Sequence, residues 1–200
     1  FLFFELHPEF SFLLDEVENY SIRLLASIFS NLVKVKGLDL DNMKLVNKRA
    51  LIAGGSTGIG AATAKLFSEE GAAVMIADVN DQNGNELVQD INENGGNAHY
   101  VHCDLSKGED VKSLLSEVDE KINGLDILVS TVGLMHMGDV VDMTEEQWDS
   151  MFAVNAKSCF LLAKYSVPMI QAAGGGSIVF MSSGAALRGN AGVTGYCGTK

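Results

Sequence analysis

Short apolar runs alternate with longer segments of helical pattern along most of this chain, from Arg49 to Lys200. The apolar runs carry the aliphatic and β-branched residues that are typical of buried parallel strands: RALIAG, AAVMIAD, AHYVHCD, LDILVST and GSIVFMSS. The segments between them predict helices: about 58–70, 81–93, 106–122, 144–154, 156–172, and one that begins near Tyr196. Strands that alternate with helices predict an α/β fold, a doubly wound parallel sheet of the Rossmann type.

Two of the predicted helices begin with the pattern of a capping box. In this pattern a hydroxyl side chain caps the first turn, and a Glu or Gln three residues later returns a bond to the amide of the hydroxyl residue. Ser106 with Glu109, and Thr144 with Gln147, have this spacing. We therefore expect these two helices to begin at Ser106 and Thr144.

The segment AGGSTGIG lies between the first predicted strand and the first predicted helix. Gly54, Gly58 and Gly60 have no side chain where the chain must turn tightly and approach a ligand closely. The helix start behind them carries unpaired N–H groups and a partial positive charge, which suit a pyrophosphate. The alternative is that these glycines serve only the packing of a strand against a helix.

An acidic residue ends each of the next two predicted strands. Asp78 stands at the distance from the glycine turn where a carboxylate accepts hydrogen bonds from the ribose hydroxyls of an adenosine. It would repel a 2′-phosphate, and the following Val79 and Asn80 are not basic, so the charges favour NAD over NADP. Asp104 follows the third strand and can face the adenine. For both acids the alternative is a role in a turn or a helix cap.

Tyr196 and Lys200 share one face of the last predicted helix. A phenol is a weak acid near neutrality, and a nearby ammonium favours its phenolate form. Such a phenol can exchange the proton of a carbonyl/alcohol pair while a hydride moves to or from a cofactor. The same spacing also occurs in pairs on exposed helix surfaces. Ser183 can hold the substrate oxygen, and the amide of Asn155 can hold a water in a proton chain behind the lysine.

Together these motifs resemble the short-chain dehydrogenase/reductase family. The resemblance runs from about Met43 to Lys200 and is carried by AGGSTGIG, CDLS, the helix of Asn155, GSIVFMSS and YCGTK. It implies a catalytic tetrad of Asn155, Ser183, Tyr196 and Lys200, in which Tyr196 is the acid/base and Lys200 also binds the nicotinamide ribose. The cofactor-binding residues that it implies are Gly54, Ser56, Thr57, Gly58, Ile59, Gly60, Asp78, Asp104, Leu105, Gly133, Tyr196 and Lys200.

Two positions depart from the pattern of this family. Ala53 stands in place of the usual threonine of the glycine turn, and STVG, from Ser130 to Gly133, stands in place of NNAG. The lost asparagine and the bulk of Val132 are expected to weaken or shift the packing of the cofactor. We expect Ser130 to keep a hydrogen bond to the backbone.

The predicted function is that of an oxidoreductase that transfers a hydride between NAD(H) and a secondary alcohol or its ketone. The candidate substrate pocket is largely apolar and favours a hydrophobic or mixed small molecule: Leu134, Met135, His136, Met137, Ala185, Ala186, Leu187 and Val193. One alternative is a 3-oxoacyl thioester reductase, which usually uses NADPH and is disfavoured by Asp78. Another is a dinucleotide-binding module without turnover.

Charge and composition exclude several other classes. The 26 acidic and 14 basic residues give a net charge of −12, so we expect no nucleic-acid partner. The three cysteines have no metal-ligand spacing, which favours a reducing, cytoplasmic compartment and no metal. The uncharged run 167–187 contains Pro168 and three consecutive glycines, so we expect no membrane span. The family resemblance also implies a dimer or tetramer, through the 156–172 helix and the one at Tyr196.

Both ends of the chain differ from a complete domain of this family. Residues 1–42 form an acidic, aromatic-rich leader without the basic region of a secretory signal. It is interpreted as misjoined upstream sequence, the tail of a preceding domain, or a helical extension over about 11–35, ahead of a domain at 43–200. Family members continue past Lys200 with further strands and a lid. We therefore expect C-terminal strands to be missing and the 200-residue chain to be inactive, because so short a last helix cannot hold Lys200 firmly.

Overall fold

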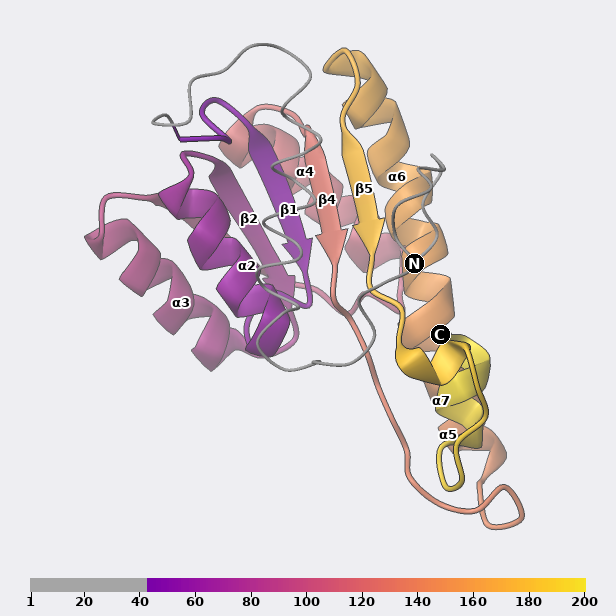
Figure 1. Cartoon of the computed structure of the whole chain (residues 1–200). Helices are drawn as coiled ribbons and strands as arrows, with labels where there is room; N and C mark the ends of the chain where they lie inside the picture. The colour runs from indigo at the N-terminus through magenta and orange to yellow at the C-terminus, as the bar shows by residue number, and fades with distance from the viewer. Residues whose placement is uncertain (1–42) are drawn as a thin grey trace, which may run out of the picture.

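A single parallel sheet organises residues 43–200, the part of the chain that the computed structural model describes; the predicted leader lies outside it. The strands are β1 (Arg49–Ala53), β2 (Ala73–Asp78), β3 (Asn97–His102), β4 (Ile127–Ser130) and β5 (Ser177–Phe180). Their order across the sheet is β3-β2-β1-β4-β5 (Figure 1). The chain starts in the middle, winds to one edge and returns to the other. This confirms the prediction of a doubly wound parallel sheet.

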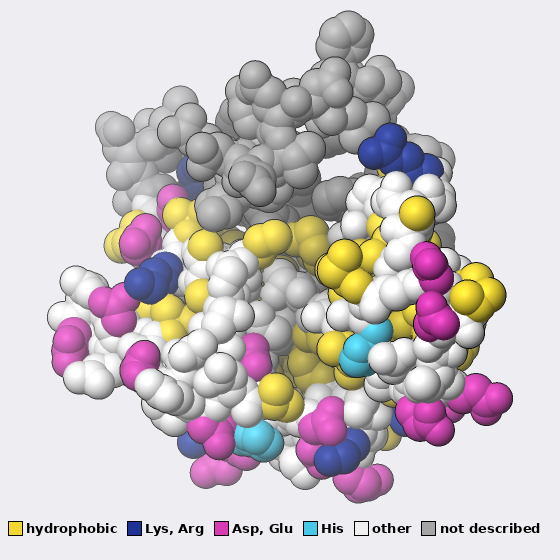
Figure 2. All heavy atoms as spheres, turned by 90° about the horizontal axis from the view of Figure 1, so that it is seen from below, with side chains coloured by type: hydrophobic (Ala, Val, Ile, Leu, Met, Phe, Trp, Pro, Cys, Tyr) yellow, Lys and Arg dark blue, Asp and Glu magenta, His cyan; other side chains and the backbone are white. Residues whose placement is uncertain are grey.

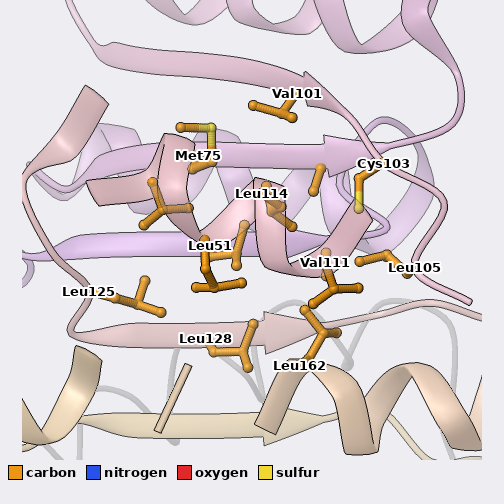
Figure 3. Packing of buried hydrophobic residues seen from close by; sticks show 14 of the residues in the cluster. Leu51, Met75, Val101, Cys103, Leu105, Val111, Leu114, Leu125, Leu128 and Leu162 are labelled. Carbon is orange, nitrogen blue, oxygen red and sulfur yellow. The ribbon is translucent and has the colours of Figure 1, made fainter. Parts of the chain in front are cut away.

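Helices cover both faces of this sheet. Helices α2 (Gly58–Glu69) and α3 (Asp81–Glu93) lie on one face, and α4 (Gly108–Ile122) and α6 (Ser158–Ala172) lie on the other. Helices α5 (Glu145–Met151) and α7 (Thr194–Thr199) lie beyond the carboxyl ends of the strands (Figure 1). Side chains of β1 alternate between the faces. Ile52 is buried with residues of α2 and α3 on one face. Leu51 is buried on the other face with Leu114 of α4 and Leu162 of α6 (Figure 3).

One of the two predicted capping boxes is present and the other is wrong. At the start of α5, the hydroxyl of Thr144 accepts the amide of Gln147 at 3.2 Å, and the amide of Thr144 donates to Oε1 of Gln147 at 3.0 Å. Helix α4 instead begins at Gly108 with Lys107 as its N-cap. The hydroxyl of Ser106 donates to Oδ1 of Asp104 at 2.7 Å. The Ser106 hydroxyl, which the sequence pattern assigned to the helix cap, is therefore bound by the carboxylate of Asp104.

The two helices predicted on either side of residue 155 form one continuous helical path. A π-helical segment, Phe152–Lys157, joins α5 to α6 and contains Asn155, which is buried. Such π-segments occur mostly as single turns within α-helices and often at functional sites. Pro168 lies within α6. Across residues 43–200, no helix combines the length and apolar character that a membrane crossing requires.

Candidate active site

The predicted site residues gather at the carboxyl ends of the strands, on either side of the point where the strand order reverses between β1 and β4. In folds of this type, ligands bind in the crevice outside these strand ends. Figure 2 views the molecule from this side and shows hydrophobic side chains toward the middle of the face.

The glycine turn brings the start of α2 close to the end of β1. A Cβ on Gly60 would lie 2.1 Å from the carbonyl oxygen of Gly54 and 2.8 Å from Oγ1 of Thr131, so only glycine allows this approach. Gly58 has a φ of 54° and open space where a Cβ would point. Glycine at this position therefore allows the positive φ of the turn and places no side chain on the surface.

The first turn of α2 fits an anionic ligand. Its N-cap, Thr57, makes no capping hydrogen bond with its side chain within the described residues. The unpaired amides at the start of a twelve-residue helix are then available to an anion, and the helix dipole favours negative charge there. Thr57 and Ile59 are exposed beside Gly58, whereas Ser56 is buried.

Asp78 lies at the end of β2, next to the glycine turn. Its Oδ2 accepts the amide of Ser56 at 3.1 Å. Its Oδ1 accepts the amides of Val79 at 2.8 Å and Asn80 at 3.1 Å. These bonds orient the carboxylate and leave further lone pairs on both oxygens for a ligand.

Asp104 has partners within its own turn, which is the alternative that the sequence left open. Its Oδ1 accepts the amide and hydroxyl of Ser106, and its Oδ2 lies 3.0 Å from Nζ of Lys107. The bonds from Ser106, with a smaller contribution from Lys107, lower the pKa of Asp104. The side chain of Leu105 is buried in the core cluster. Contact of Asp104 with adenine stays a prediction.

In STVG, the hydroxyl of Thr131 makes a hydrogen bond to the backbone of the glycine turn. Its Oγ1 donates to the carbonyl oxygen of Gly54 at 3.0 Å, which links β4 to the glycine turn. Ser130 is the last residue of β4 and is buried, and its own bond to the backbone stays a prediction. The chain turns only at Thr131, so the hydroxyl of that residue reaches the turn. Val132 packs 3.0 Å from where a Cβ on Gly54 would stand.

Lys200 reaches back from the end of α7 to the sheet. Its Nζ donates to the carbonyl oxygens of Val132 at 2.7 Å and Met181 at 3.3 Å, and lies 5.8 Å from the ring centroid of Tyr196. A Cβ on Gly133 would stand 3.4 Å from this Nζ, so glycine leaves room for the lysine. Burial lowers the pKa of Lys200, while the two carbonyl acceptors stabilise the ammonium form.

The amide of Asn155 ties three segments together. Its Oδ1 accepts the amide of Leu134 at 2.7 Å, and its Nδ2 donates to the carbonyl oxygen of Leu134 and to Oγ1 of Thr199, both at 2.8 Å. Both amide hydrogens are therefore given to protein oxygens, and a water could be held only through the remaining lone pair of Oδ1. Thr199 was missed from the sequence, although it stands beside Lys200 in YCGTK.

Cys159 was also missed from the sequence. Its thiol donates to the backbone carbonyl of Asn155 at 3.2 Å. Burial raises the pKa of this thiol, so the sulfur remains a neutral donor. The position of the cysteine four residues after Asn155 was the available signal, because residues four apart share a helix face.

Ser183 and the candidate pocket residues frame the remaining side of the site. The hydroxyl of Ser183 accepts the amide of Ala185 at 3.2 Å, at the start of the 3₁₀ turn Gly184–Ala186. The two loops of the pocket meet where the amide of Gly138 donates to the carbonyl oxygen of Gly192 at 2.9 Å. Among the predicted lining side chains, Ala185 is buried, whereas Met135, Met137 and Leu187 are exposed.

His136 faces α5. Its Nε2 lies 3.2 Å from the hydroxyl of Ser150. Within residues 43–200, no group of three His, Cys, Asp or Glu side chains is arranged to hold a metal ion. The pocket-lining role of His136 stays a prediction.

Comparison with known proteins identifies a family. Residues 48–200 match the family described as short chain dehydrogenase. A 2,5-dichloro-2,5-cyclohexadiene-1,4-diol dehydrogenase, LinX, from Sphingobium indicum is 37% identical over 157 residues, which cover 78% of this chain and 63% of the relative. A 3-oxoacyl-[acyl-carrier-protein] reductase, FabG, from Thermotoga maritima is 34% identical over 158 residues, 79% of this chain and 64% of the relative.

The fold also matches a solved structure. A 7α-hydroxysteroid dehydrogenase complexed with NADH and 7-oxo glycochenodeoxycholic acid superimposes with a TM-score of 0.77 at 30% identity. The match covers 82% of this chain and 64% of that one. The chain thus spans less than two thirds of the length of the proteins that we compare it with here.

Proposed function

This chain belongs to the short-chain dehydrogenase family, and we propose that the whole protein transfers a hydride between NAD(H) and a secondary alcohol or its ketone, with residues 43–200 as its dinucleotide-binding domain. The contact that carries this proposal is the approach of the Lys200 ammonium to the ring of Tyr196. A cation near a phenol at the strand ends is the arrangement that general acid/base chemistry on a carbonyl requires.

The residues around the glycine turn would hold the dinucleotide. The unpaired amides at the start of α2 suit its pyrophosphate, and Asp78 offers acceptors to the adenosine ribose. When bound, the nicotinamide ring supplies or accepts the hydride. Lys200 would also donate to the nicotinamide ribose, from its position against the carbonyl of Val132.

Tyr196 is proposed to give its proton to the carbonyl oxygen, or to take it from the alcohol. Lys200 stabilises the phenolate that results. Ser183 would donate to the same substrate oxygen from the loop after β5. Asn155 positions this group, because its amide joins Leu134 to Thr199.

Asp78 favours NAD over NADP in this proposal. Its carboxylate would lie against a 2′-phosphate with no basic residue following it at Val79 or Asn80. Like charges in such proximity are unfavourable. Replacing Asp78 by alanine is therefore expected to weaken NAD binding while improving the relative binding of NADP, which calorimetry with both dinucleotides would measure.

The similarity to FabG of Thermotoga maritima favours one alternative, a 3-oxoacyl thioester reductase. The exposed apolar side chains of Met135, Met137 and Leu187 support a hydrophobic substrate in either case. A panel of secondary alcohols, ketones and a 3-oxoacyl thioester, each assayed with NAD(H) and NADP(H), separates the two. Preference for the thioester with NADPH would establish the alternative.

The deciding variant is Tyr196→Phe, followed by the absorbance of the reduced nicotinamide. We expect hydride transfer to fall by about a hundredfold or more, with little change in dinucleotide affinity. Tyr165→Phe on α6 is the matched control and should keep the activity. An unchanged rate for Tyr196→Phe would refute the acid/base role. Dinucleotide binding by the unaltered protein without hydride transfer would support the remaining alternative, a binding module without turnover.

We also propose a cytoplasmic homo-oligomer, a dimer or tetramer, that forms through α6 and α7. Phe160 and Val167 on α6 are 60% and 37% exposed, and their burial against a second copy would favour association. Light scattering of the protein and of Phe160→Glu tests this. A monomer for the unaltered protein would refute the oligomer.

A further inference from the structure

An aromatic ring sits in a notch of α3, next to the strand end that carries Asp78. Gly84 lies in the interior of α3, and a Cβ there would be 2.2 Å from Cε2 and 2.3 Å from Cδ2 of Tyr100. Glycine is unfavourable in a helix interior relative to alanine. The ring therefore fills space that any other residue at position 84 would occupy, and this contact sets how closely α3 approaches β3.

The hydroxyl of Tyr100 reaches the end of β2. It lies 2.8 Å from the carbonyl oxygen of Asp78 and 2.9 Å from Oδ1 of Asp81. Both groups are acceptors, so its single proton is shared between them. Burial, together with the bond to Asp81, raises the pKa of Tyr100. The hydroxyl therefore stays protonated, and remains a donor, across the neutral range.

A histidine on the same strand holds the second acceptor. Nδ1 of His102 lies 2.7 Å from Oδ1 of Asp81, the oxygen that Tyr100 also contacts. The bonds from His102 and Tyr100 lower the pKa of Asp81, so this carboxylate stays ionised. The first residue of α3 is thus linked to two side chains of β3.

The backbone of Asp78 is held from both sides. On the side of the glycine turn, its carboxylate accepts the amides of Ser56 and Val79. On the side of β3, its carbonyl oxygen accepts the amide of Cys103 at 2.9 Å and lies within reach of the Tyr100 hydroxyl. Loss of that hydroxyl would remove the side-chain bond on the β3 side of this strand end and leave its carbonyl oxygen to the amide of Cys103 alone.

We propose that Tyr100 is a positioning residue for dinucleotide binding: seated in the Gly84 notch, it holds the end of β2 so that Asp78 presents its carboxylate to the adenosine ribose. This inference rests on the proposed function, because it requires the ribose at Asp78. Tyr100 acts through Asp78 and touches no ligand itself. Its effect is therefore confined to the adenosine half of the dinucleotide.

The test is Tyr100→Phe in the full chain, with calorimetric titration of NAD, AMP and nicotinamide mononucleotide. Phenylalanine keeps the ring in the notch and removes only the hydroxyl. We expect the Kd for NAD and AMP to rise about two- to tenfold, the range for one neutral hydrogen bond, while the Kd for nicotinamide mononucleotide stays the same. Tyr165→Phe is the matched control and should change none of the three.

A second variant tests the same contact independently, in case Tyr100→Phe changes only the stability of the fold. Gly84→Ala displaces the ring while it keeps the hydroxyl, and it should weaken AMP binding without affecting nicotinamide mononucleotide. Equal affinities of Tyr100→Phe and the unaltered protein for AMP and NAD would overturn this inference and leave the proposed function standing. Equal weakening of both halves would also overturn it. If the unaltered protein bound no NAD, both proposals would fall.

Discussion

The close approach of α2 to β1 makes a strong prediction about Gly60→Ala. The added Cβ would stand 2.1 Å from the carbonyl oxygen of Gly54 and 2.9 Å from Cα of Gly55. The first distance is shorter than van der Waals contact by about 1 Å. Both neighbours are backbone atoms of the turn, so neither can rotate away, and the start of α2 must move outward.

The magnitude follows from two opposing terms. Overpacking of this kind costs about 1–3 kcal/mol, and the better helix propensity of alanine returns about 1 kcal/mol. We expect the free energy of unfolding to fall by up to about 2 kcal/mol, which lowers Tm by up to roughly 8 °C for a domain of this size. Dinucleotide affinity should fall more steeply, by about tenfold or more, because the amides that would hold the pyrophosphate move with the helix.

Thermal unfolding and calorimetric titration with NAD measure the two effects on the same samples. The control is Gly95→Ala, at a glycine with a φ of 86° and open space for a Cβ, remote from the glycine turn. It should cost about 1 kcal/mol of stability through backbone strain and leave affinity unchanged. If Gly60→Ala bound NAD as tightly as the unaltered protein, the assignment of the α2 amides to the pyrophosphate would be wrong.

Three further predictions concern stability. Asp126→Asn breaks the paired contacts with Arg49, at 2.8 Å and 3.0 Å, and should lower the free energy of unfolding by about 2 kcal/mol at neutral pH. The hydrogen bond from Arg49 lowers the pKa of Asp126, so this contribution is present above the unfolded value of about 3.9 and is lost as the pH falls through the lower folded value. Urea unfolding at a series of pH values checks it, and a difference from the unaltered protein that persists in strong acid would contradict it. Ser166→Ala should be neutral or stabilise by up to about 1 kcal/mol, because this buried hydroxyl has no hydrogen-bond partner within the described residues; a clear loss of stability in the same assay would disprove this. Leu128→Ala, in the core cluster of Figure 3, should cost about 3 kcal/mol, and a loss under about 1 kcal/mol would show that the core repacks there.

The fold was predictable because its signals are local. An apolar run such as LDILVST can satisfy its backbone and bury both faces only inside a covered parallel sheet, and the alternation of such runs with helices leaves few topologies. The glycines of AGGSTGIG were predictable for the same reason, since positive φ and the absence of a Cβ are requirements of the turn itself.

The capping prediction failed where two groups compete for one partner. Ser106 had the spacing of a cap, but the carboxylate of Asp104 lies closer to it in the folded chain. Ser130 and Thr131 carry the same hydroxyl group, and the register of β4 decides that Thr131 reaches the turn. Sequence spacing is the same in either outcome, so it could not distinguish them.

From the order of its residues alone, this chain could be assigned a doubly wound sheet, a glycine turn with an acid behind it, and a tyrosine and lysine one helical turn apart. Those features depend on neighbours within a few residues of each other, where backbone geometry is nearly fixed. Only the folded structure revealed that Lys200 rests on the carbonyl of Val132, that Asn155 joins Leu134 to Thr199, and that Tyr100 occupies the notch of Gly84. These contacts join segments distant in sequence, and they exist because packing of the helices on the sheet brings those side chains together.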